Sequence, residues 1–293
     1  MQNLKIPSVL LEIPMISATI PETVRRLLAS QPIELPIFHP VALKLQKMLS
    51  DYDFTVDEVA HVANEDMSLA SQMLKIANSP MYMGRSKVAT IKEAVIRLGA
   101  QQVINLVIAA SQSAVHTSDN PALDHYMKQL WLHSHGCAIG AKWLAHSCGM
   151  RGVADETYLA ALLHDVGKLY LLKSIERLVG VGVISSMFDD ELILEIFEVM
   201  HVEQGYRLMQ HWNFPTMYCD IVRDHHADTW DTVNKMLTIV RFANLACRRI
   251  GLGMKHDPEL VLSDTLEAEV LDLDDSQIYE LEALLEETRE TEL

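Results

Sequence analysis

Apolar residues recur at every third or fourth position along most of this chain, which is the period of helices that bury one face. Examples of this spacing are Val41, Leu43, Leu45 and Leu49, and then Leu69, Met73, Leu74 and Ile76. No segment shows the sustained alternation of apolar and polar residues that a half-buried strand requires. The pattern therefore predicts an all-α fold, built as a bundle of helices.

Three of the predicted helices carry start signals. Thr55 and Thr90 are each followed three residues later by a glutamate, which is the spacing of a capping box. Asn120 precedes Pro121, so a capping side chain stands before a proline that suits the first helical turn. These signals predict helices that begin just after Thr55, Thr90 and Asn120.

Changes in composition divide the chain into four parts. Residues 1–24 are rich in β-branched side chains and are expected to form an N-terminal arm. Residues 25–118 form a helical half without clustered metal-type side chains, whereas residues 119–256 contain such a cluster. The polar run 116–120 marks the boundary between the two halves. Residues 257–293 hold 14 of the 40 acidic residues and one base, and their leucines predict a final helix.

Charge and composition exclude several classes of protein. The formal net charge is −16, of which −13 belongs to residues 257–293. Neither part of the chain offers a basic stripe for a phosphate backbone, so nucleic acid is not an expected partner. No apolar stretch reaches the ~20 residues of a membrane span, and the N-terminus lacks the pattern of a secretion signal. The four cysteines have no paired spacing, so we expect a cytoplasmic protein with reduced thiols and no membrane partner.

Six residues form a candidate metal site although they are far apart in the sequence. They are His133, the pair His164-Asp165, His201, and the pair His225-His226. Imidazole and carboxylate are ligands of divalent first-row ions, here Fe, Mn, Ni or Zn. Helices packed as a bundle can bring such side chains together in the core. His135 is an alternative to His133, because it lies on the same predicted helix.

The segment around His164-Asp165 carries the sharpest signal. It follows an apolar helical run over residues 158–163. Lys168 would share the face of both residues if the helix continued, and it could hold a phosphate oxygen beside a metal. Gly167 would let another backbone or a substrate come close. The alternative interpretation is a helix end with a surface His-Asp pair.

Other catalytic chemistries have no support in the sequence. There is no glycine-rich phosphate loop with a trailing Lys-Ser or Lys-Thr, and no Gly-x-Ser-x-Gly nucleophile elbow. The cysteines lie in apolar or helical segments and are interpreted as core filling.

The order His, His-Asp, His, His-His resembles the HD superfamily of metal-dependent phosphohydrolases. Further segments resemble an HDOD domain, namely Leu35-Pro36, 40–45, 66–70, 74–79, 91–99, 130–134 and 159–168. The similarity runs from about residue 25 to residue 250. It implies an HD-type helical bundle with an N-terminal helical subdomain, and a role in bacterial signalling or regulation through protein partners.

The resemblance also implies a ligand set. One ion would be held by His133, His164, Asp165 and a final aspartate, and a second by Asp165, His201, His225 and His226. Asn244 stands where that final aspartate is expected, and a neutral amide should weaken one metal position. The Gly-Tyr-Pro element of related phosphodiesterases is also missing, because residues 227–230 follow His226 instead.

Two functions remain open at this point. The expected one is a regulatory signal-transduction protein with a largely retained site for one or two divalent ions. The alternative is an active phosphohydrolase or phosphodiesterase acting on a nucleotide, a cyclic dinucleotide or another phosphate-containing ligand, with Asp165 and Lys168 as catalytic residues. Asn244 and the missing element favour regulation, whereas the retained ligands and Lys168 favour catalysis.

Overall fold

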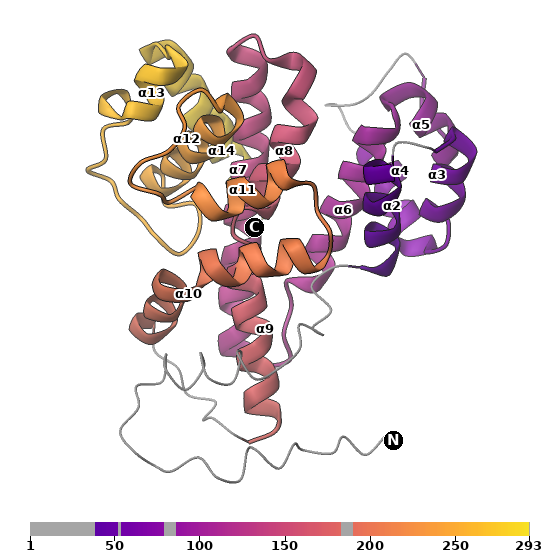
Figure 1. Cartoon of the computed structure of the whole chain (residues 1–293), viewed down its shortest axis with the longest axis horizontal. Helices are drawn as coiled ribbons and strands as arrows, with labels where there is room; N and C mark the ends of the chain where they lie inside the picture. Colours follow the sequence, from indigo (N-terminus) through magenta and orange to yellow (C-terminus); the bar gives the residue numbers. More distant parts are fainter. Residues whose placement is uncertain (1–38, 52–53, 79–85, 183–189, 293) are drawn as a thin grey trace.

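The computed structural model describes residues 39–51, 54–78, 86–182 and 190–292. The regular elements in these ranges are all helices, which confirms the predicted fold class (Figure 1). The predicted N-terminal arm, residues 1–24, lies outside them. Within the same ranges, no helix combines the length and the apolar character that crossing a bilayer requires.

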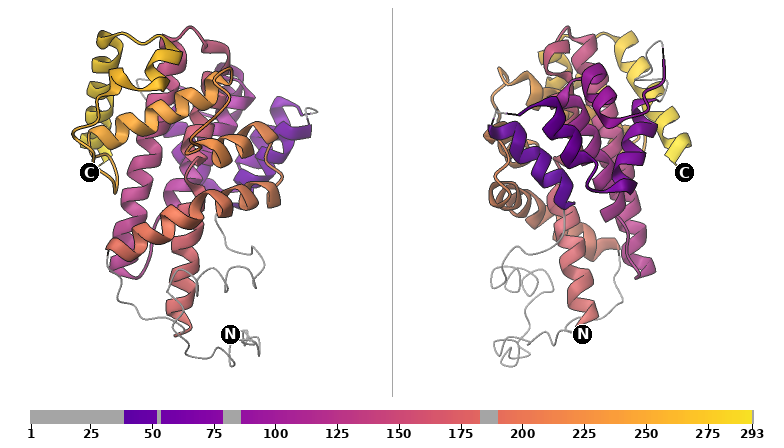
Figure 2. Two further views of the ribbon diagram at one scale, coloured as in Figure 1. Left: turned by 60° about the vertical axis from the view of Figure 1, so that its left-hand side comes forward. Right: turned by 90° about the vertical axis from the view of Figure 1, so that its right-hand side faces the viewer.

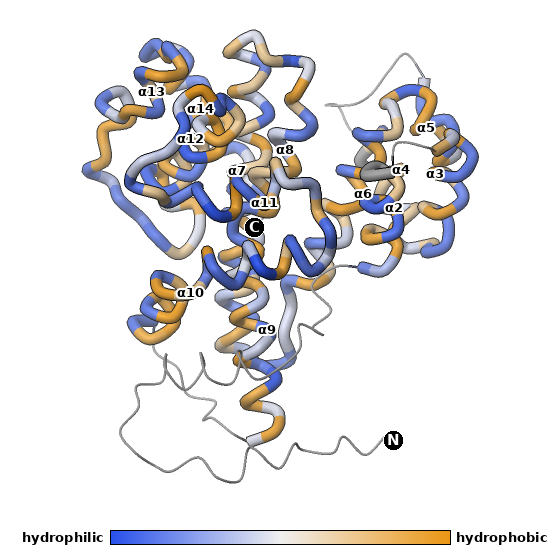
Figure 3. Tube along the Cα trace, in the orientation of Figure 1, coloured by the Kyte–Doolittle hydropathy of each residue, from blue (hydrophilic) through white to orange (hydrophobic). Residues whose placement is uncertain are grey.

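The N-terminal helices pack around one internal member. They are α2 (Pro40–Asp51), α3 (Val56–Ala63), α4 (Met67–Ala77), α5 (Ile91–Leu98) and α6 (Ala100–Val115). Every residue from 102 to 112 is buried, so α6 is enclosed on all sides. The other helices of the group alternate between hydrophobic and hydrophilic residues within each turn or two (Figure 3). This is the pattern of helices that cover a core with one face.

Two of the predicted start signals belong to this group. Thr55 forms a full capping box: its hydroxyl accepts from the Glu58 N–H, and the Glu58 carboxylate accepts from the Thr55 N–H at 2.7 Å. Thr90 caps α5 in the same way. The Glu93 carboxylate differs from the prediction, because it accepts from the Ala89 N–H and not from that of Thr90. The helix begins where predicted, with Thr90 as its N-cap, and only the bond to the glutamate carboxylate is displaced by one residue.

Helix α7 (Pro121–Ser147) is the axis of the remaining structure. It begins at Pro121 with Asn120 as its N-cap, as predicted. It packs against α8 (Ala154–Leu163), α9 (Val166–Gly180), α12 (Lys235–Arg249) and α14 (Asp275–Glu292). The short helix η2 (Arg151–Val153) leads from α7 into α8. The N-terminal helices and the C-terminal helices lie on opposite sides of α7 (Figure 2).

Two further helices complete the half that carries the candidate ligands. Helix α10 (Asp190–His211) packs across α9, and α11 (Thr216–Asp224) packs on α10 and α8. His201 lies in the interior of α10. The helix begins at Asp190, eleven residues earlier.

The acidic C-terminal segment is folded onto this half. Helices η3 (Leu262–Asp264), α13 (Leu266–Leu271) and α14 follow α12, and α14 confirms the predicted final helix. The side chains of Leu281 and Leu285 are fully buried. They lie so close to Gly140 of α7 that a Cβ there would be 3.2–3.3 Å from them. A small residue on α7 therefore allows α14 to pack closely.

Candidate metal centre

His164 and Asp165 lie at the junction of two helices. The apolar helix α8 ends at Leu163, and α9 begins at Val166. The pair is thus at a helix end, as one of the two interpretations predicted, but it is not on the surface, because both residues are only 1% exposed. Lys168 reaches Asp165 from the first turn of α9, with Nζ 2.5 Å from Oδ2.

Four histidines surround the Asp165 carboxylate. The Nε2 atoms of His133 and His164 lie 3.5 and 3.3 Å from Oδ2. Those of His201 and His225 lie 3.6 and 3.5 Å from Oδ1. Each carboxylate oxygen thus faces its own pair of imidazoles. A carboxylate placed in this way can be shared by two adjacent ions.

The orientation of these four imidazoles is fixed by the main chain. Their Nδ1 atoms lie 2.5–3.0 Å from the carbonyl oxygens of Leu252, Ala161, Phe197 and Val222. A carbonyl can only accept a hydrogen bond, so Nδ1 carries the proton and Nε2 presents a lone pair. Metal-ligating histidines are held by such contacts, which set the tautomer and the ring orientation.

The lone pairs point at an acceptor and not at a donor. Within the described part of the chain, hydrogen-bond partners are lacking for Nε2 of His164, His201 and His225 and for Oδ1 of Asp165. Buried polar atoms without partners are costly, and imidazole lone pairs facing a carboxylate repel each other. A cation between them satisfies all of these atoms at once, so this donor set fits a divalent ion.

The charge state of the site agrees with this conclusion. Burial opposes ionisation of Asp165, but the Lys168 ammonium holds the pKa of that carboxyl well below its ordinary value. Burial lowers the pKa of both His201 and His225 to about 4. At neutral pH the centre therefore contains the Asp165 carboxylate and the neutral imidazoles of His201 and His225, which are the ligand forms that metals bind.

His226 completes a second ligand group. Its ring lies beside those of His225 and His201, at centroid distances of 4.2 and 5.1 Å. One ligand atom from each of Asp165, His201, His225 and His226 lies within 4.8 Å of the others. The same limit holds for His133, His164 and Asp165. The two groups share Asp165.

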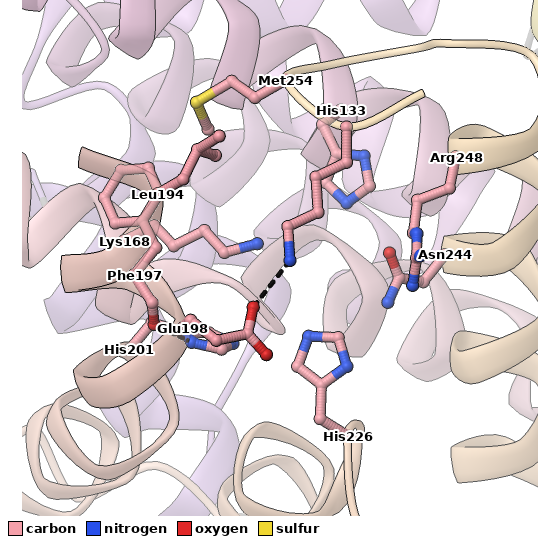
Figure 4. Close-up of a pocket in the computed structure, with 11 residues that line it drawn as sticks. His133, Lys168, Leu194, Phe197, Glu198, His201, His226, Asn244, Arg248 and Met254 are labelled. Carbon is pink, nitrogen blue, oxygen red and sulfur yellow. Dashed lines mark hydrogen bonds and ion pairs between the residues drawn. The ribbon is translucent and has the colours of Figure 1, made fainter. Parts of the chain in front are cut away.

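Asn244 lies at the edge of the first group. It is a buried residue of α12 and lines a pocket together with His133 and His226. Figure 4 shows the Asn244 amide, the Lys168 ammonium and these two imidazoles directed into one space. The position expected for a final aspartate is thus at the site, but it carries no charge.

Charged residues that the sequence reasoning missed line the same pocket. They are Arg248, Lys255 and Glu198. Lys255 and Glu198 form an ion pair at 2.7 Å, drawn as a dashed line in Figure 4. Helical spacing could have revealed two of the three residues. Glu198 precedes His201 by three residues on α10, and Arg248 follows Asn244 by four on α12.

The structure distinguishes between the two candidate histidines of α7. His133 faces Asp165, whereas His135 stacks on Trp131 with a centroid distance of 5.0 Å and an interplanar angle of 16°. The ring of His135 therefore belongs to an aromatic contact and not to the ligand groups around Asp165.

Arg241 of α12 holds the turn that carries His225 and His226. Its Nη1 donates to the carbonyl oxygens of Asp224, His225 and Ala227 at 3.0–3.2 Å. Its guanidinium lies 3.7 Å from the ring centroid of Trp230 and donates through Nε to Glu267 at 2.8 Å. The sequence after His226, which departs from the related phosphodiesterases, thus contributes an aromatic residue to this clamp.

The chain is similar to several known proteins. Residues 35–228 match the family model of the HDOD domain. An uncharacterised protein of Treponema pallidum (strain Nichols) is 24% identical over 221 residues, which are 73% of this chain and 42% of that protein. The chain thus spans less than half the length of this curated relative.

Solved structures give the same result for the fold. An HDOD domain protein of unknown function from Geobacter sulfurreducens is 25% identical, with a TM-score of 0.67 over 90% of this chain and 96% of that chain. A candidate metal-dependent phosphohydrolase from Shewanella amazonensis SB2B has a TM-score of 0.62 at 18% identity, over 90% and 98% of the two chains. A candidate signal transduction protein from Marinobacter aquaeolei VT8 has a TM-score of 0.59 at 20% identity, over 94% and 65%. The last two structures show that this chain shares their fold.

Proposed function

Because the chain belongs to the HDOD domain family, we propose that it is a regulatory signal-transduction protein that acts on protein partners and holds divalent metal in its helical core. One observation carries this proposal. Four imidazoles, each fixed by a main-chain carbonyl, present their Nε2 lone pairs to the two oxygens of one buried carboxylate. Such an arrangement costs stability without a cation, and it is the donor set of Fe, Mn, Ni or Zn.

Each group of side chains would hold one ion. The first ion would be bound by His133, His164 and Asp165 Oδ2, with Asn244 beside it, and the second by Asp165 Oδ1, His201, His225 and His226. These ligands come from α7, the α8–α9 junction, α10 and the turn after α11. Metal would therefore connect four elements that are far apart in sequence. Occupancy would stabilise one arrangement of these helices, which is how a metal centre can serve regulation.

Phosphohydrolase activity is the second candidate, and the charges around the pocket favour it. Lys168, Arg248 and Lys255 line the pocket, where each lies beside one carboxylate, that of Asp165, Asp257 and Glu198 respectively. Their ammonium and guanidinium groups would turn to the oxygens of an anionic phosphoester. A bound divalent ion would supply Lewis-acid polarisation of a phosphoryl oxygen, and Lys168 would offset negative charge on the phosphate.

The test of the metal centre is the metal content of the purified protein, measured by inductively coupled plasma mass spectrometry. We expect near-stoichiometric or higher content of a divalent first-row ion. Asp165→Ala should lose nearly all of it, because both ligand groups share that carboxylate. His135→Ala is the matched control on α7 and should keep it, since His135 lies against Trp131.

Two results would count against these proposals. A wild-type protein without metal after incubation with Fe²⁺, Mn²⁺, Ni²⁺ and Zn²⁺ in turn would reject the assembled centre. Metal-dependent turnover of nucleotide, cyclic dinucleotide or monoester substrates by the wild-type chain would replace the regulatory role with the enzymatic one.

A further inference from the structure

Two cysteines from different helices meet beside His133. Cys137 follows His133 by one turn on α7, and Cys247 comes from α12. Both thiols belong to residues with no solvent exposure. The Sγ of Cys137 lies 3.6 Å from Nε2 of His133, and the three donor atoms all lie within 4.8 Å of one another. The cluster is therefore a compact set of two sulfur ligands and one nitrogen ligand.

The other two cysteines are placed differently. The Cys219 thiol donates to the Phe214 carbonyl at 3.5 Å, and the half-buried Cys148 thiol lies 4.0 Å from the Leu271 carbonyl. Neither belongs to a group of metal-type side chains within the described residues. The four thiols of the chain thus divide into a pair that shares an imidazole and two that each face a main-chain oxygen.

We propose that Cys137, Cys247 and His133 form a second metal site, which takes a thiophilic cation such as Zn²⁺ or Cd²⁺. Two thiolates and an imidazole are the ligands that such ions prefer. In a tetrahedral site with Zn–S of about 2.3 Å and Zn–N of about 2.05 Å, sulfur and nitrogen are separated by about 3.6 Å. The observed Sγ–Nε2 distance of 3.6 Å equals this value, so the separation of these two atoms suits a shared ion.

A reactive thiol is a poorer interpretation of the same cluster. Burial, followed by the neighbouring Cys247, raises the pKa of the Cys137 thiol well above its ordinary value. Reactive cysteines have the opposite property, because the thiolate is the nucleophile. In the proposed site each thiol loses its proton as its sulfur binds the cation. Two S–H bonds are then replaced by two metal–sulfur bonds, and two protons pass to the solvent.

The thiophilic site competes with the centre at Asp165 for one ligand atom. Nε2 of His133 has a single lone pair, and it lies 3.5 Å from Asp165 Oδ2 as well as 3.6 Å from the Cys137 sulfur. An ion held by the two sulfurs therefore removes His133 from the first group at Asp165. The ion can arrive through the pocket, since His133 and Asn244 both line it and Cys247 follows Asn244 by three residues on α12.

The site is tested by titrating the reduced, metal-free full-length protein with Cd²⁺ and recording the thiolate-to-cadmium charge-transfer band in the ultraviolet. The wild type should show a band that saturates at one equivalent with the amplitude of two thiolates. C148S/C219S leaves the cluster intact and should match it. C137S/C247S carries the same number of cysteines and should lose the band. Each single variant, Cys137→Ser or Cys247→Ser, should halve its amplitude.

Two further measurements distinguish the thiolate site from the metal centre at Asp165. Asp165→Ala should keep the Cd²⁺ band, so the thiolate site does not depend on the proposed function. Wild-type protein loaded with one equivalent of Cd²⁺ should bind about one equivalent less Mn²⁺ than untreated protein, because His133 is shared. A wild type without the band, or a folded C137S/C247S variant that retains it, overturns the proposal. If that double variant does not fold, unchanged bands in both single variants overturn it equally.

Discussion

At the scale of single residues, the central feature of this protein is the enclosure of Asp165. One ammonium group and four imidazoles surround a carboxylate that has almost no contact with water. Burial opposes ionisation of this carboxyl, and the Lys168 ammonium is the main group that holds its pKa well below the ordinary value. The side chains thus form a ligand set in which Asp165 supplies the negative charge and the imidazole Nε2 atoms supply the electron pairs that a metal ion would bind.

Asn244 is the residue that limits the first metal position. Asn244→Asp would place a carboxylate beside His133 and should raise the affinity for Mn²⁺ about tenfold or more, because an anionic oxygen ligand replaces a neutral amide. The change should also increase any phosphodiesterase turnover. Isothermal titration calorimetry measures the affinity, and a phosphoester panel measures the turnover.

Asn234→Asp is the matched control for this substitution. Asn234 caps the N-terminus of the same helix α12, where aspartate is an equally good cap. It adds the same charge away from the ligands, so it should leave the affinity for Mn²⁺ unchanged. Equal affinities in Asn244→Asp and Asn234→Asp would show that position 244 is not a metal position.

At the scale of secondary-structure elements, the crossing of α9 and α10 positions two ligands at once. Gly167 follows the His164-Asp165 junction, and the backbone of α10 at His201 and Gly205 lies directly against it. The prediction that Gly167 admits another backbone is therefore confirmed. Because the carbonyl of His201 faces Gly167, the separation of the two helices sets how close the His201 imidazole comes to Asp165.

Gly167→Ala should separate these helices. The new Cβ would lie 1.9 Å from the His201 carbonyl oxygen, and main-chain atoms cannot rotate away as a side chain does. Overpacking of this kind costs about 1–3 kcal/mol or more. Urea unfolding should show the loss, with weaker Mn²⁺ binding. Gly180→Ala at the end of the same helix meets no atom within 4 Å and should retain wild-type stability. Equal stability of the two variants would contradict the close approach.

The turn after α11 depends on α12 through Arg241. Arg241→Lys keeps the charge near Glu267 but loses the fork that reaches three carbonyl groups and the stacking on Trp230. We expect a loss of about 1.5–3 kcal/mol in the free energy of unfolding, the scale of hydrogen bonds to a charged group. Mn²⁺ binding should weaken as well, because His225 and His226 lose their support. Arg249→Lys on the same helix serves as the control, and a wild-type Mn²⁺ affinity in Arg241→Lys would exclude a positioning role.

At the scale of the whole molecule, burial of neutral imidazoles makes folding sensitive to acid. The folded-state pKa values of His116, His201 and His225 are about 4, mainly because of burial, against an ordinary value of 6.5. Between these two values the unfolded chain binds more protons than the folded chain. The free energy of unfolding should therefore be fully retained above about pH 6.5 and should fall as the pH is lowered toward 4.

Chemical unfolding of metal-free protein at pH 7 and pH 4.5 measures this effect, which should be on the order of a few kcal/mol. Treatment with a chelator before the measurement removes any contribution from metal release. His201→Gln should reduce the difference between the two pH values. A stability that is constant from pH 7 to pH 4.5 would show that these imidazoles are accessible to protons in the folded state.

The acidic segment also acquires its role only in the whole molecule. As sequence, residues 257–293 are a run of acids with a few leucines, which is typical of a solvated face. In the fold, Leu281 and Leu285 are buried against α7, and the buried Glu267 pairs with Arg241. The C-terminal helices are therefore connected to the turn that carries His225 and His226 through the ion pair of Glu267 with Arg241.

Properties that depend on near neighbours along the chain could be predicted from the sequence alone. The apolar period predicted the helices, and Thr55, Thr90 and Asn120 predicted where three of them begin, because caps act within one turn. The order of the histidines and Asp165 identified the candidate ligands. Gly167 was also recognised as a place of close approach, since the absence of a side chain is visible in the sequence.

How distant residues face one another became visible only in the folded molecule. There His133 and not His135 faces Asp165, each carboxylate oxygen has its own pair of imidazoles, and Cys247 lies beside Cys137. These relations depend on the angles and the separations at which α7, α9, α10 and α12 cross. Helix crossings result from packing of the complete core, and the period of a single helix specifies its buried face but not the residues that this face meets.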